Sequence, residues 1–221
     1  MATTSLGMNG NVGATAAIVG LLHTDGTRSH RHAILLTRPD AQIRDLADAL
    51  HLIGMLHGRH PGLFDHALAH GQPDAVIPWL TAAAQGFAGE RHWLTTLVAA
   101  VGPLPSTPGQ AESEAAVSAQ RHALDTLVQS DRIGCAVGAA AALALDWTSF
   151  RELLNGAAVR LGMAIHPATL PSAIETAIAL DDFAASASVQ RATRFGAQQL
   201  LAQHHCMWDL LEARASARND G

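Results

Sequence analysis

The stretch IGCAVGAAAALAL, residues 133–145, is the most apolar run of the chain and decides its fold class. A bilayer-spanning helix needs about 20 residues, so this shorter run predicts a helix buried at the centre of the fold. Gly134 and Gly138 lie one helical turn apart and are followed by Ala142, which makes a face that another backbone can approach closely. This face indicates tight packing inside the core more than a contact between two copies of the chain.

The residues around this run predict an all-α multi-helix bundle. Ala, Leu, Gln, Glu and Arg dominate from Asp40 onward, as is typical of closely packed helices. We expect the bundle domain over residues 39–216 and a C-terminal tail over 217–221. The loop GPLPSTPG, residues 102–109, cannot be helical and is expected to separate two helical halves.

Local signals predict where several elements begin. The TDGT stretch at residues 24–27 suits a tight turn, so we expect residues 1–38 to form an N-terminal extension with a short β-hairpin, or else a helix over Ala14 to Leu22. Asp40 is expected to cap a helix that runs to about Gly58. Capping-box patterns at residues 149–152 and 172–175 predict two further helix starts.

Composition excludes several classes of protein. The 221-residue chain has 14 cationic residues, all of them arginine, and a formal net charge of −5 with a pI near 6.2. A polyanion is therefore repelled, and we expect no nucleic-acid partner. The two cysteines lack CxxC spacing, which argues against a disulfide scaffold or a cysteine zinc site and favours a reducing compartment. The start of the chain resembles no secretory signal, so we expect a cytoplasmic protein without a membrane partner.

Thirteen histidines, against five phenylalanines and four tryptophans, are the strongest sign of chemistry. Leu46, Leu50 and Ile53 form a helical stripe whose next position is His57, so that imidazole is expected to point into the core or a pocket. His57 is the first candidate for a catalytic base. His51 is a further catalytic candidate, although it could equally be a core histidine that donates to a backbone carbonyl.

Glu90 is the second signal. The apolar row of its predicted helix places this carboxylate inward, where it must be paired, hydrogen-bonded or protonated. We therefore expect Glu90 to be the partner of His57 or the catalytic acid. The alternative is a structural pair with an arginine of a neighbouring helix.

Other residues are candidates for binding a substrate. Arg59 and His60 follow the His57 helix at a turn, where a cation could meet an anionic group of the substrate. His122 and His204 fall on apolar rows of the later helices and are expected to face the interior. Trp79 completes the candidate set as an aromatic contact.

No sequence motif predicts a metal or cofactor site. Helical di-iron proteins use Glu-x-x-His pairs, which this chain lacks. His66 and His70 have i, i+4 spacing, but Ala67 breaks the His-Glu-x-x-His pattern of metalloproteases. A chain without lysine cannot form a Schiff base at a side-chain amine. We expect no cofactor, while a helical oxygenase that binds non-haem iron or haem stays an alternative.

The segment LHGRHPG, residues 56–62, resembles a motif of an uncharacterised all-helical bacterial family, with similarity from about Asp40 to Ala213. Such proteins are similar to formaldehyde-releasing lyases that act on lignin-derived aromatic dimers. The resemblance implies catabolism of aromatic compounds by cofactor-free bond cleavage. That chemistry needs a base, an acid and an apolar pocket for rings.

Together these observations predict a cofactor-independent acid/base enzyme. The expected reaction is a lyase cleavage of a C–C or C–O bond in a small apolar or aromatic substrate, with an aldehyde as a possible product. The alternatives are a metal-dependent oxygenase and a non-catalytic helical binding or dimerisation module. A homodimer is expected, because alanine-rich bundles often complete their core by pairing.

Overall fold

The structure is a computed structural model that describes residues 13–219, and these residues form helices and loops without a strand. The uncharged residues 1–12, which contribute to the expectation of no targeting signal, lie outside the described part, as do residues 220–221 of the predicted tail. In chain order the elements are α1 (Ala14–Asp25), η1 (Thr27–Ser29), α2 (Arg31–Leu36), α3 (Ile43–His57), α4 (Leu63–Ala69), η2 (Asp74–Val76), α5 (Ile77–Val101), α6 (Gln110–Val128), α7 (Cys135–Arg160), α8 (Ala173–Phe183) and α9 (Ala187–Asn219).

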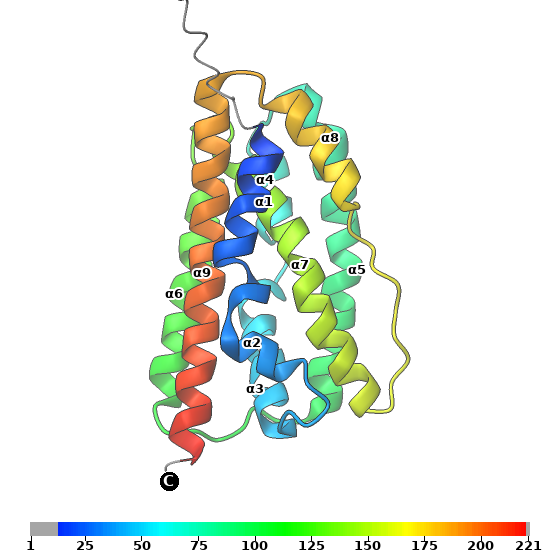
Figure 1. Ribbon diagram of the computed structural model, residues 1–221, viewed down its shortest axis with the longest axis vertical. Helices are drawn as coiled ribbons and strands as arrows, with labels where there is room; N and C mark the ends of the chain where they lie inside the picture. Colours follow the sequence, from blue (N-terminus) through cyan, green and yellow to red (C-terminus); the bar gives the residue numbers. More distant parts are fainter. Residues whose placement is uncertain (1–12, 220–221) are drawn as a thin grey trace, which may run out of the picture.

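Residues 135–145 of the apolar run lie in the first half of α7, which passes through the middle of the bundle. Ile133, the first residue of the run, precedes the helix and is exposed. Helices α6 and α9 lie on one side of α7, and α5 and α8 lie on the other (Figure 1). Every residue from Cys135 to Ala144 is buried. The prediction of an all-α bundle around a buried central helix is therefore confirmed.

Glycines allow α7 and α9 to approach closely. A Cβ added at Gly138 would lie 1.9 Å from the carbonyl oxygen of Thr193, and one added at Gly196 would lie 1.9 Å from that of Cys135. No side chain fits at such distances, because the neighbouring atoms are backbone. The small-residue face thus packs within the chain, as the sequence indicates.

A second buried contact joins α3 to α9. The Asp48 carboxylate, fully buried on α3, accepts hydrogen bonds from Nε of Arg214 at 3.0 and 2.9 Å and from Nη1 of Arg218. Both arginines also donate to Thr107 Oγ1, which attaches the proline-rich loop to the same place. This cluster sets the position of α9 along α3.

Several predicted boundaries are wrong. The predicted N-terminal hairpin is absent, because residues 14–25 form α1, which is the helical alternative, and the Asp-Gly pair ends that helix. Ser149 does not begin a helix, since α7 continues unbroken to Arg160. The α3 helix begins at Ile43 rather than directly after Asp40. At the other end, α9 continues beyond residue 216 to Asn219.

The second capping box is confirmed. The Ser172 hydroxyl accepts a hydrogen bond from the Glu175 N–H at 3.2 Å, and the Glu175 carboxylate accepts one from the Ser172 N–H at 2.7 Å. The hydrogen bonds that the Ser172 N–H and hydroxyl donate to the Glu175 carboxylate lower the pKa of Glu175. Among the described residues, no helix has the length and apolarity needed to cross a membrane.

Candidate functional site

A row of buried polar side chains crosses the bundle from α3 to η1. His57 Nε2 on α3 lies 3.0 Å from His204 Nε2 on α9. His204 Nδ1 lies 2.7 Å from Asp146 Oδ2 on α7. Asp146 in turn accepts hydrogen bonds from the Thr27 hydroxyl at 2.8 Å and the Thr27 N–H at 2.9 Å. Side chains from four elements, far apart in sequence, therefore form one continuous hydrogen-bonded row.

The helical pattern of each segment explains why these side chains meet. Leu46, Leu50 and Ile53 are buried, so the next position of that stripe turns His57 inward as predicted. His204 lies on the buried row that includes Leu201 and Trp208 of α9, and its interior position is also confirmed.

Gly26 brings Thr27 within reach of Asp146. A Cβ at residue 26 would lie 2.4 Å from the Leu22 carbonyl oxygen and 3.2 Å from Asp146 Oδ1. Glycine therefore allows the chain to turn tightly after α1. The Trp208 indole completes the row by donating to Thr27 Oγ1 at 3.0 Å.

The row has a defined order of protons when Asp146 is ionised. Asp146 can only accept, so His204 carries its proton on Nδ1 and presents a lone pair at Nε2. His57 then donates from Nε2 and keeps a lone pair on Nδ1. Burial, and secondly the neighbouring His204, hold the pKa of His57 well below its usual range. A neutral His57 is therefore available as a proton acceptor at physiological pH.

Aromatic rings enclose His57 on the core side. Phe87, Trp147 and Phe150 contact its ring edge to face, at centroid distances of 6.4, 5.8 and 6.2 Å. These rings cannot hydrate a charge, which accounts for the desolvation of the imidazole.

His57 also lines a small cavity. The space is only about 20 Å³, and its lining includes Arg59, Leu63, Arg121 and Asp125. A cavity of this size holds one water molecule. Two arginines and one carboxylate beside an otherwise apolar wall give it net positive charge.

The predicted turn residues have distinct environments. Arg59 is exposed at the rim of the small cavity. His60 is also exposed, and its Nδ1 lies 3.2 Å from Asp65 Oδ2 and 3.2 Å from Arg91 Nη2. Arg91 and Asp65 form an ion pair at 3.0 Å. Arg59 is therefore placed to meet a ligand at the cavity, whereas His60 belongs to a cluster at its edge.

Both carboxylate oxygens of Glu90 accept hydrogen bonds. Its Oε2 accepts from the Trp147 indole at 2.9 Å and from Arg151 at 3.2 Å, and its Oε1 accepts from the Thr169 N–H at 2.9 Å and hydroxyl at 3.0 Å. Glu90 therefore pairs with Arg151 of α7, which is the structural alternative that the sequence left open. His57 has His204 as its hydrogen-bond partner, and Glu90 lines a separate cavity of about 430 Å³.

The remaining candidates lie apart from the row. His51 Nε2 lies 2.8 Å from the Gly102 carbonyl oxygen, as in the core-histidine alternative. The Trp79 indole is buried and donates to Thr176 Oγ1 at 3.2 Å. The expectation that His122 faces the interior is wrong, because its side chain is exposed on α6.

Sequence reasoning missed Asp146 and Thr27. Asp146 directly follows the most apolar run, on a helix buried all round, and that context is the signal that could have identified it. Thr27 offers no such signal, because its role depends on the tight turn at Gly26.

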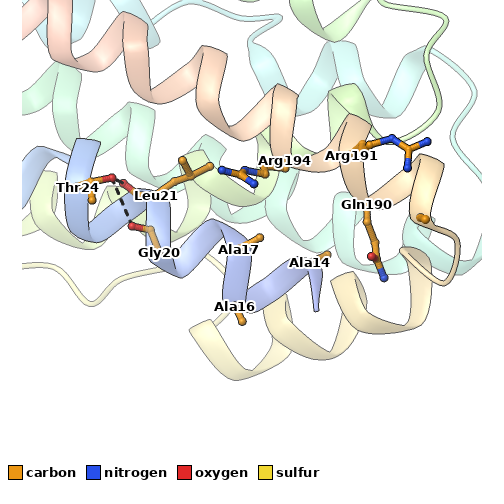
Figure 2. Close-up of a pocket in the computed structure, with 10 residues that line it drawn as sticks. Ala14, Ala16, Ala17, Gly20, Leu21, Thr24, Gln190, Arg191 and Arg194 are labelled. Atoms are coloured by element: carbon orange, nitrogen blue, oxygen red, sulfur yellow. Dashed lines mark hydrogen bonds between the residues drawn. The ribbon is translucent and has the colours of Figure 1, made fainter. Parts of the chain in front are cut away.

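A larger cavity lies elsewhere, and no residue of the row lines it. Its volume is about 520 Å³, and it lies between α1 and the start of α9. Figure 2 shows small side chains of α1 on one side and polar side chains of α9 on the other: Ala14, Ala17 and Gly20, then Gln190, Arg191 and Arg194. Without a carboxylate or imidazole in its lining, it offers no acid/base group.

The row is poorly suited to a metal, because both nitrogens of His204 are already engaged. One set of metal-ligating side chains does gather in the described part of the chain. His30, His205 and Asp209 bring a ligand atom each within 4.8 Å of one another. His205 and Asp209 are exposed on α9, whereas the neighbouring His204 faces the interior.

Comparison with protein families gives one match. The model of a family of unknown function, DUF6975, matches residues 22–219. No curated protein and no solved structure matches the chain.

Proposed function

Because this chain belongs to DUF6975, a family of unknown function, we propose its activity from the site alone: His57 is the general acid/base of a cofactor-independent enzyme. The observation that carries the proposal is the row in which Asp146 orients His204 and His204 contacts His57. Buried titratable groups in a row of this kind favour proton transfer. A core that needed only packing would place apolar side chains there.

The proposed chemistry follows from the order of protons. His57 Nδ1 takes a proton from a substrate hydroxyl, and the Nε2 proton moves towards His204 as positive charge develops. The buried Asp146 carboxylate stabilises that charge. Acid/base catalysis of this kind contributes about 100- to 10,000-fold in rate.

In a lyase reaction His57 acts first as the base and then as the acid. Loss of the hydroxyl proton forms a carbonyl as the adjacent C–C bond breaks, and the released electron pair on carbon takes the proton back from His57. Arg59 and Arg121 beside the cavity favour a substrate in which negative charge develops. This step also fits release of an aldehyde, which the resemblance of the 56–62 motif implies.

The small cavity limits how the substrate binds. A ring does not fit into about 20 Å³, so only the hydroxyl end of the substrate reaches His57. The remainder of the substrate then lies at the rim beside exposed Arg59 and Pro61. Small hydroxy acids and aromatic compounds with a short hydroxylated side chain are the substrate class of the proposal.

The test is a screen of such compounds for aldehyde release by the full chain. We expect His57→Gln to lose activity while it keeps its helical circular dichroism, and His92→Gln, an exposed histidine on α5, to keep activity. Equal turnover by the wild type and His57→Gln would refute the proposal.

A second candidate function is non-catalytic binding of a small ligand in the cavity of about 430 Å³. Two buried atoms of its lining residues, Arg151 Nε and Asn155 Oδ1, have no hydrogen-bond partner among the described residues. A ligand with one acceptor and one donor would satisfy both. Under this alternative, ligand-induced thermal stabilisation is lost in Asn155→Leu and unchanged in His57→Gln.

A further inference from the structure

Three side chains of the metal-ligating type meet where the η1–α2 junction contacts α9. His30 Nε2 lies 3.2 Å from Asp209 Oδ1, and His205 Nε2 lies 3.9 Å from the same oxygen. The rings of His30 and His205 contact edge to face at a centroid distance of 4.8 Å. Two imidazoles thus converge on one carboxylate.

The fold brings these groups together from two directions. His205 and Asp209 are at i and i+4 on α9 and therefore share one face of that helix. His30 stands between η1 and α2 and is only 6% exposed, which restricts the movement of its ring. Its Nε2 nevertheless points to the exposed carboxylate of Asp209, so an ion could enter from solvent.

One separation in the set already matches that of a bound ion, and the three ligand atoms lie within 4.8 Å of one another. Zinc binds histidine nitrogen and carboxylate oxygen at about 2.0–2.2 Å, so neighbouring ligand atoms of a tetrahedral site are about 3.3 Å apart. The His30–Asp209 pair already has that separation. A small rotation of the half-exposed His205 ring brings in the third ligand.

We propose that His30, His205 and Asp209 form a binding site for a divalent transition ion of the zinc class, with water as the fourth ligand. Two imidazoles and a carboxylate suit zinc and similar ions and do not suit calcium or magnesium, which prefer all-oxygen sites. The inference does not depend on the proposed catalytic role of His57.

Binding requires a change of tautomer at His30. The His32 N–H donates to His30 Nδ1 at 3.2 Å, so in the neutral ring the proton is on Nε2, which faces Asp209. The ion binds the Nε2 lone pair, so the proton of the ring moves from Nε2 to Nδ1. Nδ1 then no longer accepts the hydrogen bond from His32, which weakens the start of α2 and limits the affinity.

A bound ion would attach the segment from Thr27 to His30, which contributes Thr27 to the buried row, to α9. His30 is three residues from Thr27, which donates to Asp146, and His205 follows His204 directly. An ion held between His30 and α9 would therefore restrain Thr27 and the backbone around His204. Its expected role is to stabilise the fold on the outer side of that row.

The experiment is calorimetric titration of the chelator-treated, untagged full chain with zinc chloride. We expect one zinc ion bound per chain and a melting temperature that rises with zinc concentration. His205→Gln and Asp209→Asn change exposed side chains, so both variants fold, and each should weaken zinc binding by at least about tenfold. Exposed His92 on α5, in the control His92→Gln, should leave binding unchanged.

Two results would overturn the site. The first is that the wild-type chain, like His205→Gln, binds no zinc over the whole range of the titration. The second is zinc binding that is equal in the wild type, His205→Gln and Asp209→Asn, which would place the ion on other histidines. Turnover by His57, where present, is not part of either measurement.

Discussion

Asp146 Oδ2 lies 2.7 Å from His204 Nδ1, and both side chains are almost completely excluded from solvent. A carboxylate at that depth is tolerated because three donors satisfy it, two from Thr27 and one from His204. The same arrangement fixes which nitrogen of His204 carries the proton. The structural need to satisfy a buried charge and the chemical need to orient an imidazole are met by the same contacts.

Replacing Asp146 with Asn should lower the stability of the fold and disturb the orientation and tautomer of His204. The amide offers one acceptor in place of two, so at least one of the three buried donors loses its partner, and His204 no longer prefers its proton on Nδ1. We expect a loss of roughly 2–4 kcal/mol in the free energy of unfolding and about 100-fold or more in turnover. Nitrogen-15 NMR of the histidine rings reports the tautomer directly. An unchanged His204 tautomer in Asp146→Asn would contradict the assigned order of protons.

Stability should fall as the pH drops below about 6.5. The pKa of His57 is lowered in the folded chain, chiefly by burial, so the unfolded chain binds a proton that the folded chain does not. Stability is then complete above the unfolded pKa and decreases towards the folded pKa, by up to about 1.4 kcal/mol per pH unit. His32, whose pKa burial also lowers, adds to the same slope.

Urea unfolding at pH 7.5, 6.5 and 5.5 measures this slope. His57→Gln should flatten the profile between pH 6.5 and 5.5, since only His32 then contributes a lowered pKa. A slope in His57→Gln equal to that of the wild type would mean that His57 is protonated in the folded chain.

Glu90→Gln should affect stability far more than catalysis at His57. Removal of its charge leaves the buried Arg151 without a counterion, which costs roughly 3–5 kcal/mol. Glu152→Gln is the matched control, because Glu152 pairs with Arg28 in solvent and should cost about 1 kcal/mol at most. Chemical denaturation compares the two. If Glu90→Gln retained wild-type stability but lost turnover per folded molecule, Glu90 would be a catalytic acid after all.

The close approach of α7 to α9 can be tested by comparing Gly→Ala substitutions at two positions of α7. Gly138→Ala places a methyl group against the Thr193 carbonyl and should lower the free energy of unfolding by about 3 kcal/mol or more. Gly156→Ala, on the same helix with no atom near its Cβ, should raise it by about 0.4–1 kcal/mol. Thermal melts of both variants decide the matter, and equal destabilisation would argue against the packing role of Gly138.

The fold was largely predictable because its signals are local. The apolar run of α7, the stripe that ends at His57 and the capping box at Ser172 each depend on residues within a few helical turns. The N-terminal segment was harder, since an Asp-Gly pair suits a hairpin turn and a helix end equally well. What decides between them is the packing of α1 against α9, which no local pattern contains.

The candidate site was predictable only in part, for a related reason. Periodicity correctly turned His57 and His204 inward, but it gave no information about which inward groups would meet. His57 pairs with a residue 147 positions away, and Glu90 with one 61 positions away. Such pairings depend on how the helices cross. From the sequence alone, a pair of His57 with Glu90 was therefore as reasonable as a pair of His57 with His204.

The ion pair between Asp48 and Arg214 has a consequence for His57, although it lies about two and a half helical turns away. The contacts between α3 and α9 include one between residues 48 and 214 and another between residues 57 and 204. Because both helices are stiff rods that run in opposite directions, a slip of one residue at either contact would shift the other by about 1.5 Å. The salt bridge therefore helps to set the distance between the two imidazoles. A substitution near the end of α9 can therefore alter the distance between His57 and His204 without contacting either ring.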